Sequence, residues 1–188
     1  MPLTLITPPA TEPVTLAQAK AHCRIDGTAD DALVGALIAA AREACEHKLG
    51  RPLITQTWER ALEYFAGGAI LLGKFKPLSI VSVNYLDDAG ADTLLDPSAY
   101  TLDDATEPGY LLPAYGTSWP SARPTANSVR VRFTAGYGPA ASDVPIAIQQ
   151  WILIAVGSMY EQRTGLADKA LGSVPFIDAL LDAERIYQ

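Results

Sequence analysis

The sequence predicts an α+β fold, in which a helical core made of an N-terminal helix pair and C-terminal helices carries an inserted antiparallel β-subdomain. Apolar residues recur with the helical period near both ends of the chain and with the strand period of two in between. Clusters of Gly, Pro and Asp separate the strand-like segments, as turns do. We therefore expect an arm and helix pair over residues 1–53, the β-subdomain over 54–138, and helices that complete the core over 139–188.

The chain begins with an arm and a short helix. Residues 1–13 contain four prolines, which fix the backbone and remove hydrogen-bond donors, so order in this arm should need a partner. Thr15 and Gln18 have the spacing of a capping box, which predicts a short helix that ends near Cys23.

A second, longer helix follows the first. Thr28 or Asp30 caps its start, and Gly50 ends it. Its apolar stripe consists of Leu33, Val34, Leu37, Ile38, Ala41, Cys45 and Leu49.

After Pro52 the apolar period changes to two, with Trp58, Leu62 and Tyr64 on one side of a half-buried strand. Residues 87–90 read as a hairpin turn. Further strands are expected at 69–72, 80–86, 93–95, 99–102, 110–112 and 129–134. Arg130 and Arg132 share one face of the last strand, and in an acidic protein a cross-strand acid pair explains them best.

The helical period then returns. Asp143 is the expected cap of a helix over residues 146–163, whose apolar positions are too many for a single face. This helix is therefore either the centre of the helical core or partly an interface between subunits. A loose stretch over residues 164–174 precedes a last amphipathic helix over 175–186.

Composition limits the function classes. The 188 residues are 49% hydrophobic and 19% charged, below the usual share of about 25%, so much of the surface is uncharged and suits protein contacts. The net charge of -7 argues against binding nucleic acid through phosphate neutralisation. The N-terminus lacks a secretory pattern and the apolar stretches are too short for a bilayer, so we expect a cytoplasmic protein with no membrane contact. Two cysteines exclude a disulfide scaffold.

One segment imitates a dinucleotide-binding turn, because a strand is followed by Gly136-Tyr137-Gly138 and then by a helix. The third glycine of that motif is missing, and Asp143 puts a negative charge where a phosphate would bind. Glu161 lies within the following helical pattern instead of ending a second strand, where an acid would hold a ribose. We therefore interpret the segment as a strand that ends in a turn.

Other chemistry is also poorly supported. His22-Cys23 and Cys45-Glu46-His47 have spacings that cannot readily chelate one zinc ion on a helix. The paired aspartates lack the alternating spacing of a calcium loop. We expect no metal, cofactor or catalytic residue, and a protein that is not an enzyme. An enzyme using Cys45 and His47 stays as a third alternative, which predicts selective thiol reactivity at neutral pH.

Several blocks, taken in order, resemble the head-tail connector (adaptor) family of long-tailed bacteriophages and prophages. The blocks are PVTLAQAKAHCRID, DDALVGALIAAAREACE, RPLITQTWE, SWP, VRVRFTAGYG, VPIAIQQWIL and YEQR, which span the chain nearly end to end. Cys23 departs from the pattern, where a larger aliphatic residue is expected. This departure concerns packing more than function.

The resemblance implies a structural virion protein at the head-tail junction, assembled in the bacterial host cytoplasm. It implies a ring of about twelve copies between the portal protein and the head-closure or tail-completion protein. Double-stranded DNA would pass through the hole without sequence recognition. The exact copy number, the face that meets the portal and assembly without the portal stay open.

The resemblance also suggests interface residues. The C-terminal segment is the candidate for holding the portal, through Phe176, Leu180, Leu181, Ile186 and Tyr187. The arm, the irregular loop that contains Trp119 and the broadly apolar helix are candidates for contacts between subunits, through Pro8, Pro9, Trp119 and Ile154. The main alternative is a small carbohydrate- or peptide-binding module that uses the loop of Tyr115 and Trp119. That alternative predicts a monomer whose tryptophan fluorescence changes on binding ligand.

Overall fold

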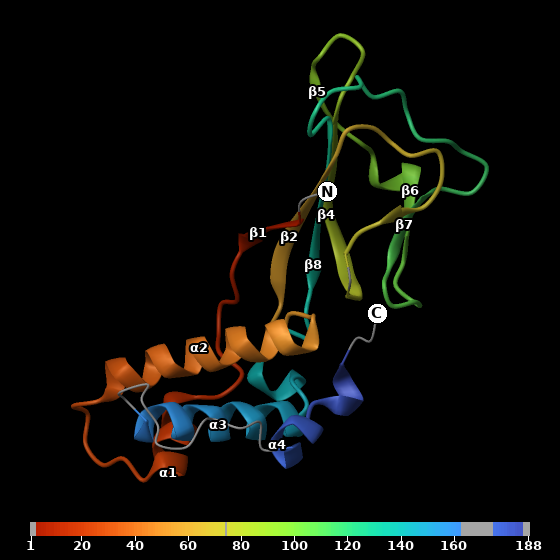
Figure 1. The fold of residues 1–188 in the computed structure, drawn as a ribbon. Coiled ribbons are helices and arrows are strands. Elements are labelled where there is room, and N and C mark those ends of the chain that lie inside the picture. The colour runs from red at the N-terminus through yellow and green to blue at the C-terminus, as the bar shows by residue number, and fades with distance from the viewer. Residues whose placement is uncertain (1–2, 74, 163–174, 186–188) are drawn as a thin grey trace. The chain divides into compact units, whose positions relative to one another are not determined.

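The computed structural model describes residues 3–73, 75–162 and 175–185 of the chain, and it confirms the α+β class (Figure 1). Two compact units divide the chain. The β unit comprises residues 1–9 and 55–136, and the helical unit comprises residues 10–54 and 137–188. No helix among the described residues combines the length and apolar character needed to cross a membrane.

The β unit is built on a five-stranded antiparallel sheet in the order β1-β2-β8-β4-β5. The bounds of these strands are Leu3–Thr7 (β1), Gln56–Leu62 (β2), Val129–Ala135 (β8), Pro77–Leu86 (β4) and Asp92–Leu94 (β5). Figure 1 shows β2, β8 and β4 running side by side. The turn expected at residues 87–90 joins β4 to β5, with Gly90 at a φ of 88°.

The arm differs from its prediction. Residues 3–7 form β1, which pairs with β2 of the same chain, so the expectation that the arm needs a partner for order is wrong. The prolines flank this segment and none lies within it, so they remove no donor from the strand. As an edge strand, β1 needs only one neighbour.

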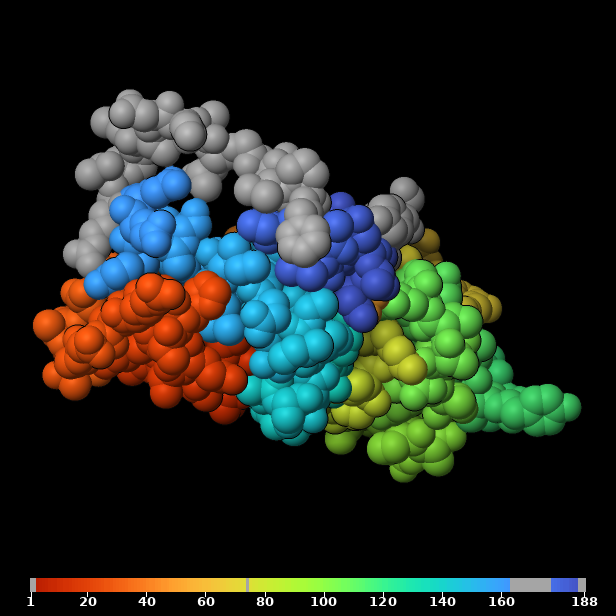
Figure 2. Space-filling view, turned by 90° about the horizontal axis from the view of Figure 1, so that it is seen from below, coloured from red at the N-terminus to blue at the C-terminus, as the bar shows by residue number. Residues whose placement is uncertain are grey.

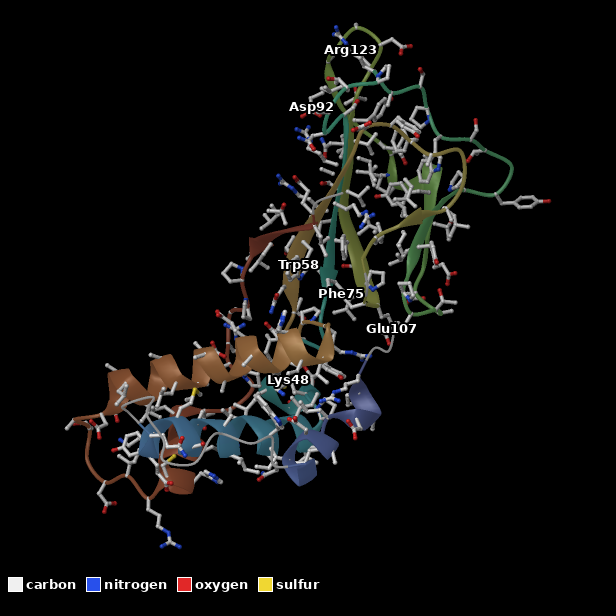
Figure 3. The ribbon with its side chains drawn as sticks, viewed as in Figure 1. Lys48, Trp58, Phe75, Asp92, Glu107 and Arg123 are labelled. Atoms are coloured by element: carbon white, nitrogen blue, oxygen red, sulfur yellow. The ribbon has the colours of Figure 1, made fainter. Side chains whose placement is uncertain are left out.

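The inner face of the five-stranded sheet is mainly apolar, although Arg60 of β2 is opposite Val131 on the same side. Val129, Val131 and Phe133 alternate along β8 and are completely buried. Phe75 packs against this face with its ring tilted, and its centroid is 6.2 Å from that of Phe133 and 5.6 Å from that of Trp58 (Figure 3).

A three-stranded sheet in the order β3-β7-β6 lies on that inner side, with β6 and β7 to one side of β4 in Figure 1. Its strands are Ile70–Leu71 (β3), Tyr110–Pro113 (β7) and Tyr100–Asp103 (β6). Ile70 and Leu111 are opposite each other and buried. Gly109 is required before β7, because a Cβ there would collide with the ring of Pro77 at the start of β4.

The helical unit packs three main helices around one core. They are α1 (Leu16–Cys23), α2 (Asp31–Leu49) and α3 (Ile146–Glu161). The capping box predicted at the start of α1 is present: Thr15 Oγ1 accepts the Gln18 N–H, and Gln18 Oε1 accepts the Thr15 N–H. Gly50 ends α2 at a φ of 74°, as predicted. Residues buried between the helices include Val34, Ile38, Cys45, Ile148, Ile152 and Val156.

Two predictions about helix ends need correction. Asp143 does not cap α3, because it ends a short 3-10 turn over Ala141–Asp143 and accepts the Ala140 N–H instead. The helix starts at Ile146, after Pro145. The last helix, α4 (Pro175–Ala179), is shorter than expected and gives way to a 3-10 turn over Asp182–Glu184. The stretch expected over residues 164–174 lies outside the described residues.

Candidate assembly surfaces

The C-terminal segment, residues 175–185, is fixed to the helical core. Leu181 is completely buried. Asp178 accepts hydrogen bonds from Lys48 Nζ at 3.3 Å and from Trp151 Nε1 at 3.4 Å. These donors outweigh partial desolvation, which alone would raise the pKa of Asp178, so that its pKa lies below the usual range. In Figure 2 the dark blue C-terminal segment lies directly on the blue and cyan residues of the same unit.

The turn that imitates a nucleotide site holds the end of this segment. Tyr137 donates its hydroxyl proton to Glu184 Oε2 at 2.5 Å, and Arg51 Nη1 donates to the Tyr137 hydroxyl at 3.4 Å. The Arg51 guanidinium also lies 5.7 Å from the centroid of the Tyr137 ring. Burial and the neighbouring carboxylate raise the pKa of Tyr137, so its hydroxyl stays protonated and able to donate. The turn thus has a structural role.

The proposed portal residues differ in what they expose. Leu180 is partly exposed, whereas Leu181 belongs to the core of its own subunit and offers no free surface there. The side chain of Phe176 and residues Ile186 and Tyr187 lie outside the described part of the chain. Of the five candidates, Leu180 is therefore the one whose exposed side chain the structure describes.

A buried arginine ties the end of the arm to α2. Arg42 Nε donates to Glu12 Oε2 and Arg42 Nη1 donates to Glu46 Oε2, each at 2.9 Å. Glu46 Oε1 also accepts the Leu53 N–H at 2.9 Å. Desolvation alone would lower the pKa of Arg42, but Glu46 and Glu12 outweigh it and raise that pKa. The cluster holds two chain segments on one helix.

The proposed subunit-interface residues occupy different settings. Trp119 stacks on Phe65, with ring centroids 5.0 Å apart and planes 8° apart, and its Nε1–H donates to the Gly68 carbonyl. One face of its ring and its polar atom are therefore already engaged within the β unit. Ile154 on α3 is half-buried. Pro8 is exposed, and Pro9 is half-buried.

An open groove of about 520 Å³ crosses the helical unit beside α1 and α2, and its lining includes Leu16, Gly35, Ile38 and Pro139. Its polar side chains are already bonded: Thr11 to the Pro139 carbonyl, Glu12 to Arg42, and Thr15 to Gln18. Recognition of a small ligand needs convergent polar groups that are available to it. This groove presents mainly apolar surface instead.

The cysteines considered as nucleophiles or metal ligands lie in environments that do not activate them. Cys45 is completely buried, and burial raises its pKa to about 12, so its thiol is protonated at neutral pH. Burial and nearby Glu161 also raise the pKa of Cys23. Among the described residues, no group of three or more His, Cys, Asp or Glu side chains has the arrangement of a metal site. The geometry gives the enzyme alternative no activated nucleophile at Cys45.

Residues 13–70 match the family model of the phage gp6-like head-tail connector protein. The resemblance to the head-tail connector family is confirmed. The matched region contains α1, α2, β2 and the start of β3.

Solved structures resemble this chain over its whole length. One is described as the neck of an empty gene transfer agent (GTA) particle computed with C6 symmetry, with 25% identity, a TM-score of 0.81, and coverage of 100% of this chain and 97% of that chain. Another, the virion of a native GTA particle, has 25% identity, a TM-score of 0.79 and the same coverage. No curated protein matches this chain.

A third structure, the neck of a native GTA particle computed with C12 symmetry, shares the fold at 23% identity, with a TM-score of 0.78 and the same coverage. The two structures at 25% identity come from a particle neck and a virion, which supports the predicted head-tail junction as the location. The neck computed with C6 symmetry also supports an oligomeric ring in a virion as the assembly type.

Sequence reasoning missed one set of surface residues. Leu78 and Val81 on β4 and Leu94 on β5 are large aliphatic side chains that are exposed on the β unit. Leu78 and Val81 lie at two register shifts in β4. Such a shift is defined by the pairing with a neighbouring strand, so it cannot be recognised in the sequence of one strand. A cross-strand comparison was needed to find them.

Proposed function

We propose that this protein is a head-tail connector that forms a ring at the head-tail junction of a phage-like particle. The ring would lie between the portal protein and a head-closure or tail-completion protein, with double-stranded DNA passing through its hole. The observation that carries this proposal is the match of the whole chain, at a TM-score of 0.81, to a protein in a particle neck computed with C6 symmetry.

The physical chemistry of the chain supports this function. Copies that form a ring need extensive uncharged surface, and only 19% of the residues are charged. DNA that must move through a channel should not be held by it, and a net charge of -7 disfavours tight contact with phosphates. The polar groups of the nucleotide-like turn and the Arg42 cluster hold chain segments in place, which is a scaffold role.

The binding-module alternative is disfavoured by the geometry of its main residue. Stacking of Trp119 on Phe65 and the bond from its Nε1–H leave one ring face for a ligand and no free polar atom. Tyr115 is fully exposed, and the ring that stacks on Trp119 is that of Phe65. An aromatic platform would need both rings to converge on one ligand.

Light scattering and negative-stain microscopy of the purified protein at high concentration test the proposal. A closed ring with a central hole is expected, alone or on purified portal. A protein that stays monomeric under both conditions would overturn the connector proposal, and a saturable fluorescence change with a carbohydrate or peptide would then support the binding module.

The C-terminal segment is the proposed portal-binding element, and two variants test it. Deleting residues 175–188 removes the segment, but the loss of Leu181 from the core also destabilises the helical unit. Leu180→Asp changes a partly exposed neighbour and leaves Leu181 in place. We expect the substitution to weaken portal binding while the melting temperature changes little. Portal binding that survives both changes would refute this role.

A further inference from the structure

The outward face of the five-stranded sheet is exposed. On β8, Arg130, Arg132 and Thr134 alternate with the buried residues and point away from the core. Their cross-strand neighbours on β2 and β4 are half-buried or exposed as well. This outer face consists of polar side chains into which a few aliphatic ones are set.

Two β-bulges bring the aliphatic side chains there. Register shifts between Pro77 and Ser79 and between Ile80 and Ser82 leave Leu78 and Val81 as extra residues on β4. Their neighbours Ser79 and Ser82 are opposite the outward-pointing Thr134 and Arg132, and both extra residues are exposed, which places them on the outer face. Val81 is 56% exposed.

Leu94 joins the same face from β5. It is opposite Asn84, which is itself opposite the outward-pointing Arg130, and it is 63% exposed. The outer face therefore carries Leu78, Val81 and Leu94, three aliphatic side chains that contribute little to the core of their own subunit.

The charges on this outer face are compensated within it. Arg132 Nε lies 2.6 Å from Glu59 Oε2, directly across on β2, and Arg130 Nη2 lies 2.6 Å from Asp92 Oδ2 on β5. Copies with a net charge of -7 repel one another, so a locally neutral face lets two copies meet at low electrostatic cost. The paired arginines are also poorly placed to neutralise phosphates.

The opposite side of the β unit has a second apolar surface. Because Ile70 and Leu111 point inward, the alternate residues Leu71, Tyr110 and Leu112 point outward on the three-stranded sheet. Leu71 is exposed, and the other two are half-buried. No charged residue occurs in β3 or β7, but Asp103 of β6 is opposite Tyr110, so this second face is apolar over β3 and β7 and acidic at its β6 edge.

We propose that the outer face of one copy packs against this second face of the next copy in the ring. Two different surfaces on opposite sides of one unit form a head-to-tail contact, which repeats around a rotation axis and closes into a ring. Contact would bury Val81 and Leu94 of one copy against Leu71 and Tyr110 of its neighbour. The inference rests on the proposed function, since it names the surfaces that build the proposed ring.

Three single substitutions test the contact. Val81→Asp places a charge on the outer face, and Leu71→Asp places one on the second face. Ile146→Asp is the matched control, because it changes an exposed aliphatic residue of the helical unit to the same charged residue. Circular dichroism and thermal melting establish that each variant folds. Ring formation is measured by light scattering and negative-stain microscopy, alone and on purified portal.

We expect Val81→Asp and Leu71→Asp each to weaken subunit association about 100-fold, because an unpaired carboxylate would be desolvated in the contact. The control should form rings like the wild type. A mixture of the two variants should give one-to-one heterodimers, since each variant retains the surface that the other has lost. Those heterodimers cannot extend, because both remaining faces carry aspartate.

The outcomes separate this inference from the proposed function. Rings that persist in both variants would refute the contact and leave the connector function standing. Loss of rings in Ile146→Asp as well would also refute the proposed contact, because ring loss would then depend on the added charge and not on its position. A wild-type protein that forms no ring under either condition would refute the function itself.

Discussion

The two units use the same kind of ion pair in different ways. In the helical unit, the Arg42 side chain is 8% exposed and binds Glu12 and Glu46. In the β unit, the Arg132 side chain is 49% exposed and binds Glu59 across two strands. The difference teaches that the helical unit uses its charges to hold its own segments together, whereas the β unit uses them to keep an open face neutral.

The largest expected effect comes from breaking the buried pair. Arg42→Ala removes a buried cation from Glu12 and Glu46, whose side chains are 33% and 16% exposed, and should lower the free energy of unfolding by about 3 kcal/mol, the low end for a buried pair. Arg132→Ala is the matched change in the β unit and should cost at most about 1 kcal/mol, because solvent screens an exposed pair. Urea unfolding of both variants at neutral pH measures the difference. Equal losses would contradict the proposed division of roles.

Core packing gives the next effect and shows whether the C-terminal segment belongs to the helical unit. Leu181→Ala removes a completely buried side chain and should lower the free energy of unfolding by about 2 to 4 kcal/mol. Val81→Ala removes an exposed side chain from the β unit and should change it by less than about 0.5 kcal/mol. A small loss for Leu181→Ala would mean that the segment leaves the core in solution.

Local signals in the sequence predicted much of the fold. The capping box at Thr15, the left-handed Gly50 and the turn ending at Gly90 each depend on residues within one turn of chain, and all three are present. The acid partners of Arg130 and Arg132 were expected on chemical grounds, and the structure contains them.

The features that sequence reasoning missed depend on distant residues. The pairing of β1 with β2 joins residues fifty or more positions apart, which no local propensity encodes. The bulges at Leu78 and Val81 appear only when β4 is compared with β8. Asp143 was expected to cap α3, but its carboxylate accepts the N–H of Ala140 in the preceding turn instead. The role of Tyr137 also depends on Glu184, far along the chain.

A single hydroxyl tests how firmly the helical unit holds its C-terminal segment. Tyr137→Phe keeps the ring beneath Arg51 but removes the donor to Glu184. It should lower the free energy of unfolding by about 1 to 2 kcal/mol, because Glu184 loses one partner and retains Arg51 at 4.0 Å. Tyr85→Phe, a half-buried tyrosine of the β unit, serves as the control in the same urea titrations. A neutral result for Tyr137→Phe would mean that water replaces the lost bond.

The smallest effect is the pH dependence of the bond between Asp178 and Lys48. The folded-state pKa of Asp178 lies below its ordinary value of about 3.9, so the stabilisation is complete above that value and disappears as the pH falls through the folded pKa. Asp178→Asn should therefore lower the free energy of unfolding by less than about 1 kcal/mol at pH 6, because both partners are partly exposed. At low pH the wild type loses the same charge, so the two proteins should converge. If the difference at pH 6 persisted unchanged at pH 3, the effect would arise from packing against Trp151 and not from charge. The segment would then be held by the same dry contacts as the rest of the helical unit, and acid would not loosen it.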